Sequence, residues 1–496
     1  MKFVLSIDQG TTGTRAMIFN HSGEEVSKSY IKHKQIFPKP GWVEHNPEEI
    51  WGNSLTVIKE AISSADLDSN QICSIGVTNQ RESIVAWNKE TKKPLHNAIV
   101  WQCRRTAEIC DTLKYDGFFD IFNNKTGLVL DPYFSGTKIK WLLANSNKVQ
   151  DQLKQNNLAV GTIDSWLIWN LTGKHVTDYS NASRTLLFNI HSGEWDNELL
   201  EIMKVPQSIL PEVRPSSDKN FYGLTKNKIL GSEIPVAGCA GDQQAALFGQ
   251  TCFDEGDVKN TYGTGNFMLM NSGNQAIKSE TGLLTTIAWK IDNKLTYALE
   301  GSVFITGAAI QWLEKGIEIL ENKEELTKIM QETPDTQGVF FVPAFVGLGA
   351  PYWDSYARGT MVGLTRGTTR DHIIRATIES ICFQSEDVFQ AMSKDSGTPI
   401  TVLRVDGGVT NCLPLLQFQA DISNVIVQKS RVNETTALGA AYFAGLAVNY
   451  WEDLEDIRQN FLIEQTFEST MTSEKRDDLK DLWKRAIERA KAWVEK

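Results

Sequence analysis

The feature that most constrains the fold is the first stretch of the chain, residues 3–15, with the sequence FVLSIDQGTTGTR. Its apolar and β-branched residues predict a buried strand that ends at Asp8. Gly10 and Gly13 allow a tight turn, and the threonines beside them supply hydroxyls and exposed N–H groups. Such a turn suits a phosphate, and Asp8 suits a Mg²⁺ ion held through water. The alternative is an ordinary hairpin turn, since Asp, Gly and Thr are common there.

The composition limits the class of protein. A chain of 496 residues is expected to form two or three domains, at about 150 residues each. A net charge of −11 argues against nucleic acid and anionic membranes as main partners. The 7 cysteines are scattered without metal-ligand spacing, so we expect reduced thiols in a cytoplasmic protein. The apolar stretch at 339–353 contains prolines and glycines, and we therefore expect no membrane insertion.

Polar residues follow a second predicted strand, residues 72–78. Arg81 and Glu82 are adjacent there, and in a loop two such opposite charges can converge on one small polar ligand. Trp101 and Tyr133 follow later, the latter in a loop just before a helix. Aromatic faces against C–H groups and polar tips on hydroxyls would suit a polyol. The alternatives are a solvated turn for the charges and a core position for each aromatic residue.

A third motif, residues 234–250, has the sequence IPVAGCAGDQQAALFGQ and predicts a strand, a small-residue turn and a helix that begins near Asp242. An acid at a helix start is often only a cap. The flanking Gly238 and Gly241 instead indicate that another group approaches the backbone here too closely for a side chain to fit. Upstream, Asn46 and Pro47 predict the capped start of a helix over 48–63.

The second half of the chain repeats the character of the first. Residues 259–266, KNTYGTGN, predict another strand followed by Gly-Thr-Gly, which indicates an internally duplicated α/β architecture with a cleft between the halves and a boundary near residue 250. A third glycine turn at 406–408 would let an adenine or ribose lie against bare backbone. Residues 433–447 predict a capped helix with small residues on one face, and 479–493 an amphipathic helix that covers the core.

Taken together, these motifs resemble the FGGY family of carbohydrate kinases over nearly the whole chain. The motifs DQGTT, PGWVEH, NQRE, IVWQCRRTA, DPYFSG, AGDQQAALFGQ, TYGTG, GLGAPYWD and DGG occur in family order at family-like spacing. The resemblance implies an α/β fold with two ribonuclease-H-like domains of the actin-like ATPase type and a catalytic cleft between them. It places the domains at residues 1–250 and 251–496, the second binding the nucleotide.

The resemblance also implies roles for individual residues. Asp242 is the implied catalytic base, which accepts the proton of the attacking hydroxyl. The implied polyol contacts are Arg81, Glu82, Trp101, Tyr133, Asp242, Gln243 and Phe267. The implied nucleotide contacts are Thr11, Thr12, Gly13, Arg15, Thr264, Gly307, Gln311, Gly408 and the position of Cys412. Asp8 is implied to lie near Mg²⁺.

Three positions depart from the family pattern. Cys412 stands where the family usually has Asn, with Asn411 next to it. Glu233 stands where some bacterial relatives have an Arg that binds a sugar bisphosphate inhibitor, and its charge would repel that anion. Asn220 stands where others carry a phosphorylated His. We therefore expect neither control to operate here.

The activity implied by the resemblance is the ATP-dependent phosphorylation of glycerol to sn-glycerol 3-phosphate and ADP. Two alternatives remain at this point: a kinase of another small polyol or sugar, and an actin-like or chaperone-like ATPase without a polyol pocket. The implied partners are glycerol, ATP and ADP, with Mg²⁺, and a second copy of the chain in a homo-oligomer, as a dimer or tetramer.

Overall fold

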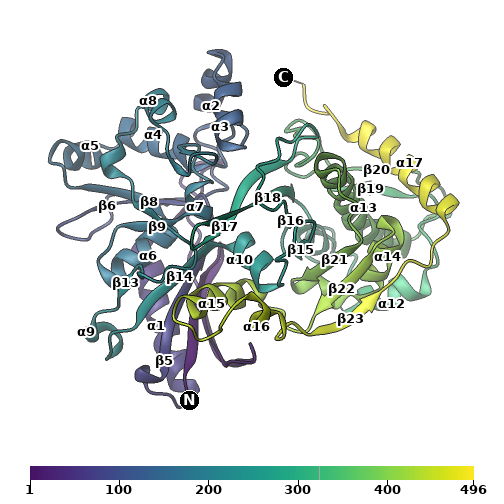
Figure 1. Ribbon diagram of the computed structural model, residues 1–496. Coiled ribbons are helices and arrows are strands. Elements are labelled where there is room, and N and C mark those ends of the chain that lie inside the picture. The colour runs from purple at the N-terminus through teal and green to yellow at the C-terminus, as the bar shows by residue number, and fades with distance from the viewer. Residues whose placement is uncertain (323, 496) are drawn as a thin grey trace.

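The computed structural model describes residues 1–322 and 324–495, and within them the chain forms two large mixed β-sheets (Figure 1). The N-terminal sheet has the strand order β13 (Gly223–Leu224), β14 (Pro235–Gly241), β5 (Ile72–Asn79), β1 (Phe3–Gln9), β2 (Gly13–Phe19) and β3 (Glu25–Lys32). The C-terminal sheet has the order β17 (Leu284–Ile291), β18 (Lys294–Val303), β16 (Asn266–Asn271), β15 (Val258–Tyr262), β21 (Val402–Asp406), β22 (Ile426–Ser430) and β23 (Ile463–Phe467).

The two sheets share one central pattern. In each, the first strand pairs antiparallel with the next one along the chain: β1 with β2, and β15 with β16. On its other side the first strand pairs parallel with a later strand, β5 or β21, and beyond that lies a further parallel strand, β14 or β22. This confirms the predicted duplication and the ribonuclease-H-like, actin-like fold. Each hairpin turn contains the glycines and threonines that the sequence singled out.

Two helices cross from one half to the other. Helix α10 (Asp242–Gly249) contacts β15 and β16 of the C-terminal sheet, while α15 (Thr435–Ala447) contacts β1, β5 and β14 of the N-terminal sheet. The helices also pack tightly on each other, and Figure 1 shows both near the middle of the molecule. A Cβ on Gly439 would lie 1.8 Å from the carbonyl oxygen of Ala245, so only glycine fits at this crossing. The prediction that α15 is a close-packing helix is confirmed.

The remaining elements cover the sheets and form smaller ones. A four-stranded sheet has the order β4 (Glu44–His45), β7 (Ala98–Ile99), β6 (Ile84–Asn88) and β8 (Leu158–Thr162). Two-stranded sheets pair β10 (Phe188–Asn189) with β11 (Glu194–Trp195), β12 (Glu212–Arg214) with β9 (Val176–Asp178), and β19 (Phe340–Val342) with β20 (Thr360–Val362).

The helices of the N-terminal half are α1 (Pro47–Ser64), α2 (Ala107–Tyr115), α3 (Phe119–Thr126), α4 (Ser135–Asn145), α5 (Asn147–Lys154), α6 (Ile163–Thr172), α7 (Tyr179–Ala182), α8 (Asn197–Met203) and α9 (Asn227–Leu230). Those of the C-terminal half are α11 (Gly307–Gln311), α12 (Glu324–Glu332), α13 (Arg370–Ser396), α14 (Leu413–Ser423), α16 (Leu454–Arg458) and α17 (Ser473–Ala490). Short 3₁₀ turns lie at Ser69–Gln71, Gln207–Ile209 and Gly408–Asn411, and a π-helical turn at Trp312–Gly316.

Helix ends test the local predictions. Asn46 caps α1 by accepting a hydrogen bond from the N–H of Glu48, as predicted. Helix α15 was predicted to be capped, and this is wrong, because no side chain caps its start at Glu434. Helix α17 ends at Ala490, so Trp493 lies beyond it and is 68% exposed, although Trp483 is buried in the core as expected.

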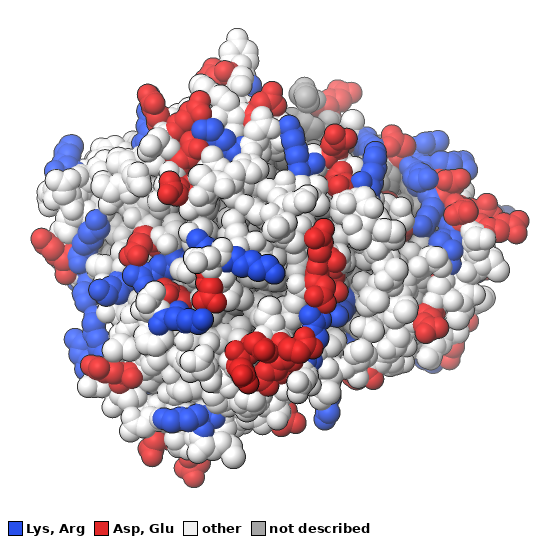
Figure 2. All heavy atoms as spheres, viewed as in Figure 1, with Lys and Arg blue, Asp and Glu red and all other residues white. Residues whose placement is uncertain are grey.

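The surface carries no extended field of one sign on the face that Figure 2 shows, where acidic and basic side chains are interspersed. Among the described residues, no helix is both long and apolar enough to cross a bilayer. All 7 cysteines are free.

The crossing of α10 and α15 leads to a stability prediction. We expect Gly439→Ala to lower the free energy of unfolding by about 1–3 kcal/mol or more, because the added methyl group meets the backbone of Ala245. The matched control is Gly52→Ala in α1, where a Cβ meets nothing within 4 Å; it should be neutral or slightly stabilising. Urea denaturation of the two variants measures both, and equal stabilities would contradict the prediction.

Candidate active site

A cavity of about 740 Å³ is lined by residues from both halves of the chain. It brings together every predicted polyol residue and the threonines of both glycine loops: Thr11, Thr12, Arg81, Glu82, Trp101, Tyr133, Asp242, Gln243, Thr264 and Phe267. The remaining predicted residues are not among those that line it: Asp8, Gly13, Arg15, Gly307, Gln311, Gly408 and Cys412.

A strained turn at the end of β5 presents the charged pair. Glu82 has φ of 60°, a left-handed conformation that is uncommon for a residue with a side chain. The N–H of Ser83 donates to the carbonyl oxygen of Arg81 over 2.7 Å, and the hydroxyl of Ser135 donates to the carbonyl oxygen of Glu82 over 3.0 Å. These bonds hold the turn, and both side chains face the cavity.

Behind this turn, two arginines and two glutamates form one buried network. Arg81 and Arg184 both donate to the carboxylate of Glu300, and Arg184 Nε donates to Glu82 Oε1 over 2.7 Å. All four side chains are at most 2% exposed. The arginines lower the pKa of Glu300 to about 2 against the opposing effect of burial, so this carboxylate stays charged. Since Glu300 lies on β18, the network joins the two halves.

Aromatic rings form one wall of the cavity. Trp101 and Tyr133 pack edge to face with ring centroids 5.5 Å apart. The Tyr133 hydroxyl lies 3.4 Å from Nη2 of Arg81, and the guanidinium of Arg81 lies 6.0 Å from the ring centroid of Phe267. Apolar faces beside polar tips are the lining that a small polyol requires.

Asp242 is the first residue of α10, where the helix N-terminus favours a negative charge. Its Oδ1 lies 3.2 Å from Arg81 Nε, and its side chain is 28% exposed. Burial raises the pKa of Asp242 above its ordinary value, although Arg81 and Lys259 act against this. Gly241 is needed just before it, because a Cβ there would lie 2.6 Å from Cδ of Arg81. This explains one of the two flanking glycines; Gly238 instead lies against the backbone of Ala444 in α15.

The first glycine loop joins β1 to β2. The N–H of Gly10 donates to the carbonyl oxygen of Gly13 over 2.9 Å, which closes the turn. Thr11 accepts a 2.9 Å bond from the indole N–H of Trp101, so this loop is joined to the aromatic wall of the cavity. Arg15, on β2, pairs with Glu434 just before α15 and lies 3.8 Å from Asp8.

Of the predicted nucleotide residues outside the first loop, Gly307 lies against the second glycine loop. Backbone bonds join Gly307 to Gly263 and Ala308 to Thr264, over 3.0 Å in each case. Gly408 is exposed, with open space where a side chain would be, and Gln311 is exposed on α11.

Cys412 does not lie on the exposed surface, unlike Gly408 and Gln311. It is 6% exposed and belongs to the C-terminal hydrophobic core, whereas its neighbour Asn411 is exposed. A cysteine fits this position because it packs inside the core, so a polar contact from this turn has to come from Asn411.

Asp8 fits the proposed place of a metal ion. Its side chain is 14% exposed, and among the described residues it contacts one cation, Arg15, at 3.8 Å and has no hydrogen-bond donor to its carboxylate. Burial raises its pKa, and Asp8 in turn raises the pKa of Asp242. A carboxylate with free lone pairs beside a loop of hydroxyls is a suitable outer ligand for Mg²⁺.

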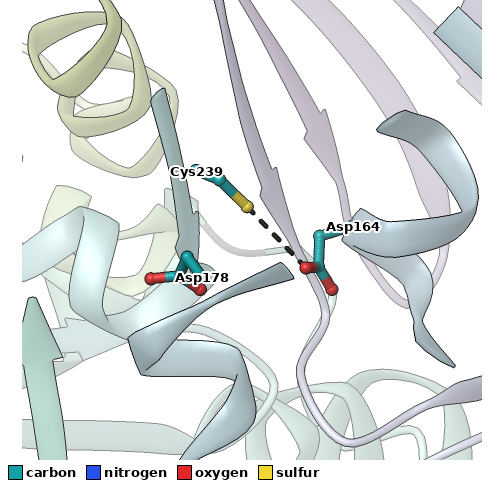
Figure 3. A group of neighbouring side chains, drawn as sticks. All are labelled: Asp164, Asp178 and Cys239. Carbon is teal, nitrogen blue, oxygen red and sulfur yellow. Dashed lines mark hydrogen bonds between the residues drawn. The ribbon is translucent and has the colours of Figure 1, made fainter. Parts of the chain in front are cut away.

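A second group, of two acids and a cysteine, includes Cys239 of β14 itself (Figure 3). Asp164, Asp178 and Cys239 are fully buried, with Cys239 Sγ 3.8 Å from Asp164 Oδ2. Their carboxylates already accept bonds from hydroxyl and amide groups, and Ser180, bonded to Asp178, accepts the N–H of Gly241. We assign this group to the support of the strand end before Asp242.

Three buried charged residues of this region have no counterpart in the sequence-based prediction: Arg184, Glu300 and Lys259. For Arg184 and Glu300 the signal in the sequence is a single charge inside an otherwise uncharged stretch, as in TYALEGSVF around Glu300, whereas Lys259 follows several acidic residues and has no such signal. Such a charge is normally placed on an exposed strand face, but here the whole strand from Thr296 to Val303 is buried.

The fold and the cavity together define a class: a two-domain, actin-like phosphotransferase that acts on a small polar substrate. Family models support this. The model of the FGGY family of carbohydrate kinases, N-terminal domain, matches residues 3–249, and the model of the C-terminal domain matches residues 258–448. The chain therefore belongs to the FGGY family of carbohydrate kinases.

Several named relatives cover the whole chain. Glycerol kinase of Caldanaerobacter subterraneus subsp. tengcongensis is 58% identical over 100% of this chain and 99% of its own, and glycerol kinase 2 of Thermotoga maritima is 56% identical over 99% of both. Among solved structures, Plasmodium falciparum glycerol kinase with ADP has a TM-score of 0.93 at 38% identity, covering 100% of this chain and 99% of its own.

The buried network leads to a prediction for Glu300→Gln. Removing the Glu300 charge leaves the two buried arginines with Glu82 as the one remaining carboxylate of the network, so one positive charge there is uncompensated. We therefore expect the free energy of unfolding to fall by about 3–5 kcal/mol and the affinity for the polyol to fall as Arg81 loses its anchor. Denaturant unfolding and substrate titration measure these effects. The control is Asp481→Asn, which breaks an exposed pair with Lys484 and should change neither. A Glu300→Gln protein as stable as wild type would contradict this account.

Proposed function

We propose that this chain transfers the γ-phosphoryl group of ATP to glycerol and forms sn-glycerol 3-phosphate and ADP, with Mg²⁺. The observation that carries the proposal is the position of the Asp242 carboxylate, which contacts Arg81 in the same cavity that the threonines of both glycine loops line. The full-length relatives named glycerol kinase support the choice of substrate.

The side chains around the cavity fix the polyol. Arg81 donates and Glu82 accepts, so the pair can bind two neighbouring hydroxyls, while Trp101, Tyr133 and Phe267 contact the carbon chain. One terminal hydroxyl then faces Asp242. A site built on hydrogen bonds to several hydroxyls discriminates strongly against compounds that lack one.

In the transfer step, the terminal hydroxyl oxygen of glycerol bonds to the γ-phosphorus and the bond from that phosphorus to the β,γ-bridging oxygen breaks. The hydroxyl proton passes to Asp242, and ADP leaves. The Asp242 pKa, raised by burial, makes it a better proton acceptor once it is ionised. The protein chiefly supplies alignment, because phosphoryl transfer needs little covalent help.

The two glycine loops are proposed to hold the nucleotide. Thr11, Thr12 and Thr264 offer hydroxyl and backbone N–H groups to the phosphates. Gly13, Arg15, Gly307, Gln311 and Gly408 surround these loops, and Asn411 rather than Cys412 is the exposed side chain at the third turn. Bound Mg²⁺ would neutralise phosphate charge, with Asp8 as its outer ligand.

Other features of the proposal concern organisation. We propose domains at residues 1–250 and 251–496, a homo-oligomer of two or four copies, and a cytoplasmic protein with reduced cysteines. Control by a sugar bisphosphate or by histidine phosphorylation is not expected, since Glu233 and Asn220 occupy the positions concerned.

The test of the function is a coupled ADP-release assay with ATP and Mg²⁺, run with glycerol, dihydroxyacetone, xylulose, gluconate or no substrate. We expect the strongest response with glycerol and its loss when a chelator removes Mg²⁺. A stronger response to xylulose or gluconate would favour another sugar kinase of the family. Equal hydrolysis with and without substrate would point to an ATPase and overturn the proposal.

We further expect Asp242→Asn to lower kcat by about 10²–10⁴-fold, since the amide cannot accept the proton. Calorimetric titration should find ADP binding within about twofold of wild type, because Asp242 contacts the polyol end of the cavity. Matching losses of turnover and ADP affinity would contradict its assignment as the base.

A further inference from the structure

Lys259 is a buried cation that the mechanism above does not use. It lies on β15, its residue is 0% exposed, and its ammonium makes three hydrogen bonds. Nζ donates to Gln243 Oε1 over 2.5 Å, to Thr261 Oγ1 over 3.1 Å and to the carbonyl oxygen of Phe267 over 3.2 Å. Each partner is an acceptor, so the three N–H groups of a charged ammonium are all satisfied.

This lysine has no direct counter-ion. Across residues 1–322 and 324–495, no carboxylate lies within 4.0 Å of Nζ. A buried charge without a carboxylate partner costs stability, and an apolar residue would fill the same space more favourably. The three bonds therefore point to a role in the cavity rather than in packing.

The contact with Gln243 fixes the orientation of an amide. Because an ammonium can only donate, the oxygen of the Gln243 amide must face Lys259 and its NH₂ must face away. Gln243 lines the cavity, and among the described residues its Nε2 has no hydrogen-bond partner. That NH₂ is thus held ready to donate to an oxygen of the substrate.

The other two contacts lie on either side of the second glycine loop. Thr261 precedes the loop and Phe267 follows it, while Gln243 belongs to α10, which is contributed by the N-terminal half. One ammonium therefore joins the ends of a phosphate-facing loop to a polyol-facing amide.

We propose that Lys259 is a positioning residue that aims the amide of Gln243 at a substrate hydroxyl oxygen. The inference rests on the proposed function and deepens it, because it assigns the orientation of Gln243 to a residue of the opposite half.

The electrostatic part of this role involves four facing groups. Asp406 on β21, Asp242 on α10 and Glu300 on β18 favour the charged ammonium, while Arg81 disfavours it. Burial outweighs the carboxylates and lowers the pKa of Lys259 to about 8. The ammonium is thus present at neutral pH and lost above about pH 8. While present, it lowers the pKa of Asp242.

The test compares the wild-type protein with Lys259→Met, which keeps the stem and removes the charge. For the variant we expect kcat/KM for glycerol to fall by about 10- to 100-fold, with ADP affinity by calorimetry nearly unchanged. The acid limb of its pH profile should move up by about one unit, because Asp242 loses a stabilising cation. The alkaline limb of wild type, near the lysine pKa of about 8, should disappear.

The control is Lys429→Met, a 5% exposed lysine on β22 that pairs with Glu464 outside the cavity; its pH profile should match wild type. If Lys259→Met does not unfold cooperatively and is therefore not folded, the same pH profile is measured on Lys259→Arg instead. Its guanidinium does not titrate, so the acid limb should stay in place and the alkaline limb should vanish.

Two failures are distinguishable. A wild-type protein without glycerol-dependent ADP release overturns the proposed function. A glycerol-active wild type with an unmoved pH profile in Lys259→Met, or with the alkaline limb retained in Lys259→Arg, overturns only the role of Lys259.

Discussion

The structure depends on a carboxylate, Glu300, that is buried between two arginines from the other half of the chain. Each of these ions has lost its hydration, and removing one alone would leave an uncompensated charge in a medium of low polarity. The halves can therefore pack at this point only when Arg81, Arg184, Glu82 and Glu300 meet together. The same contact that joins the halves orients the Arg81 guanidinium toward Asp242.

The crossing helices place Asp242 in the same region. Helix α10 starts at Asp242 and ends at Gly249, against α15 of the opposite half. Backbone contact between Gly249 and Gly439 leaves no space to shift one helix along the other. The position of Asp242 is thus set by interior packing at one end of a short helix and by Arg81 at the other.

A site residue could be predicted when its neighbours in the sequence indicate its role. Arg81, Glu82 and Asp242 stand at the ends of strands, where adjacent residues alone indicate a polar site. Glu300, Arg184 and Lys259 are defined by contacts over long sequence separations, for which no spacing rule exists. For the contact between α10 and α15, the sequence indicates only the small residues on one helix face. Trp493 fits the helical period of residues 479–493, but α17 ends at Ala490.

Different parts of the cavity are lined by side chains and by backbone. Charged and aromatic side chains line the part proposed for the polyol, while the loops of Gly and Thr line the part proposed for the phosphates. The hydroxyl of Thr11 bridges the two ends, since it accepts the indole N–H of Trp101. A change in the position of Trp101 would therefore reach the first glycine loop. Under the proposed function, this one hydrogen bond would link the size of the polyol to the position of the phosphates.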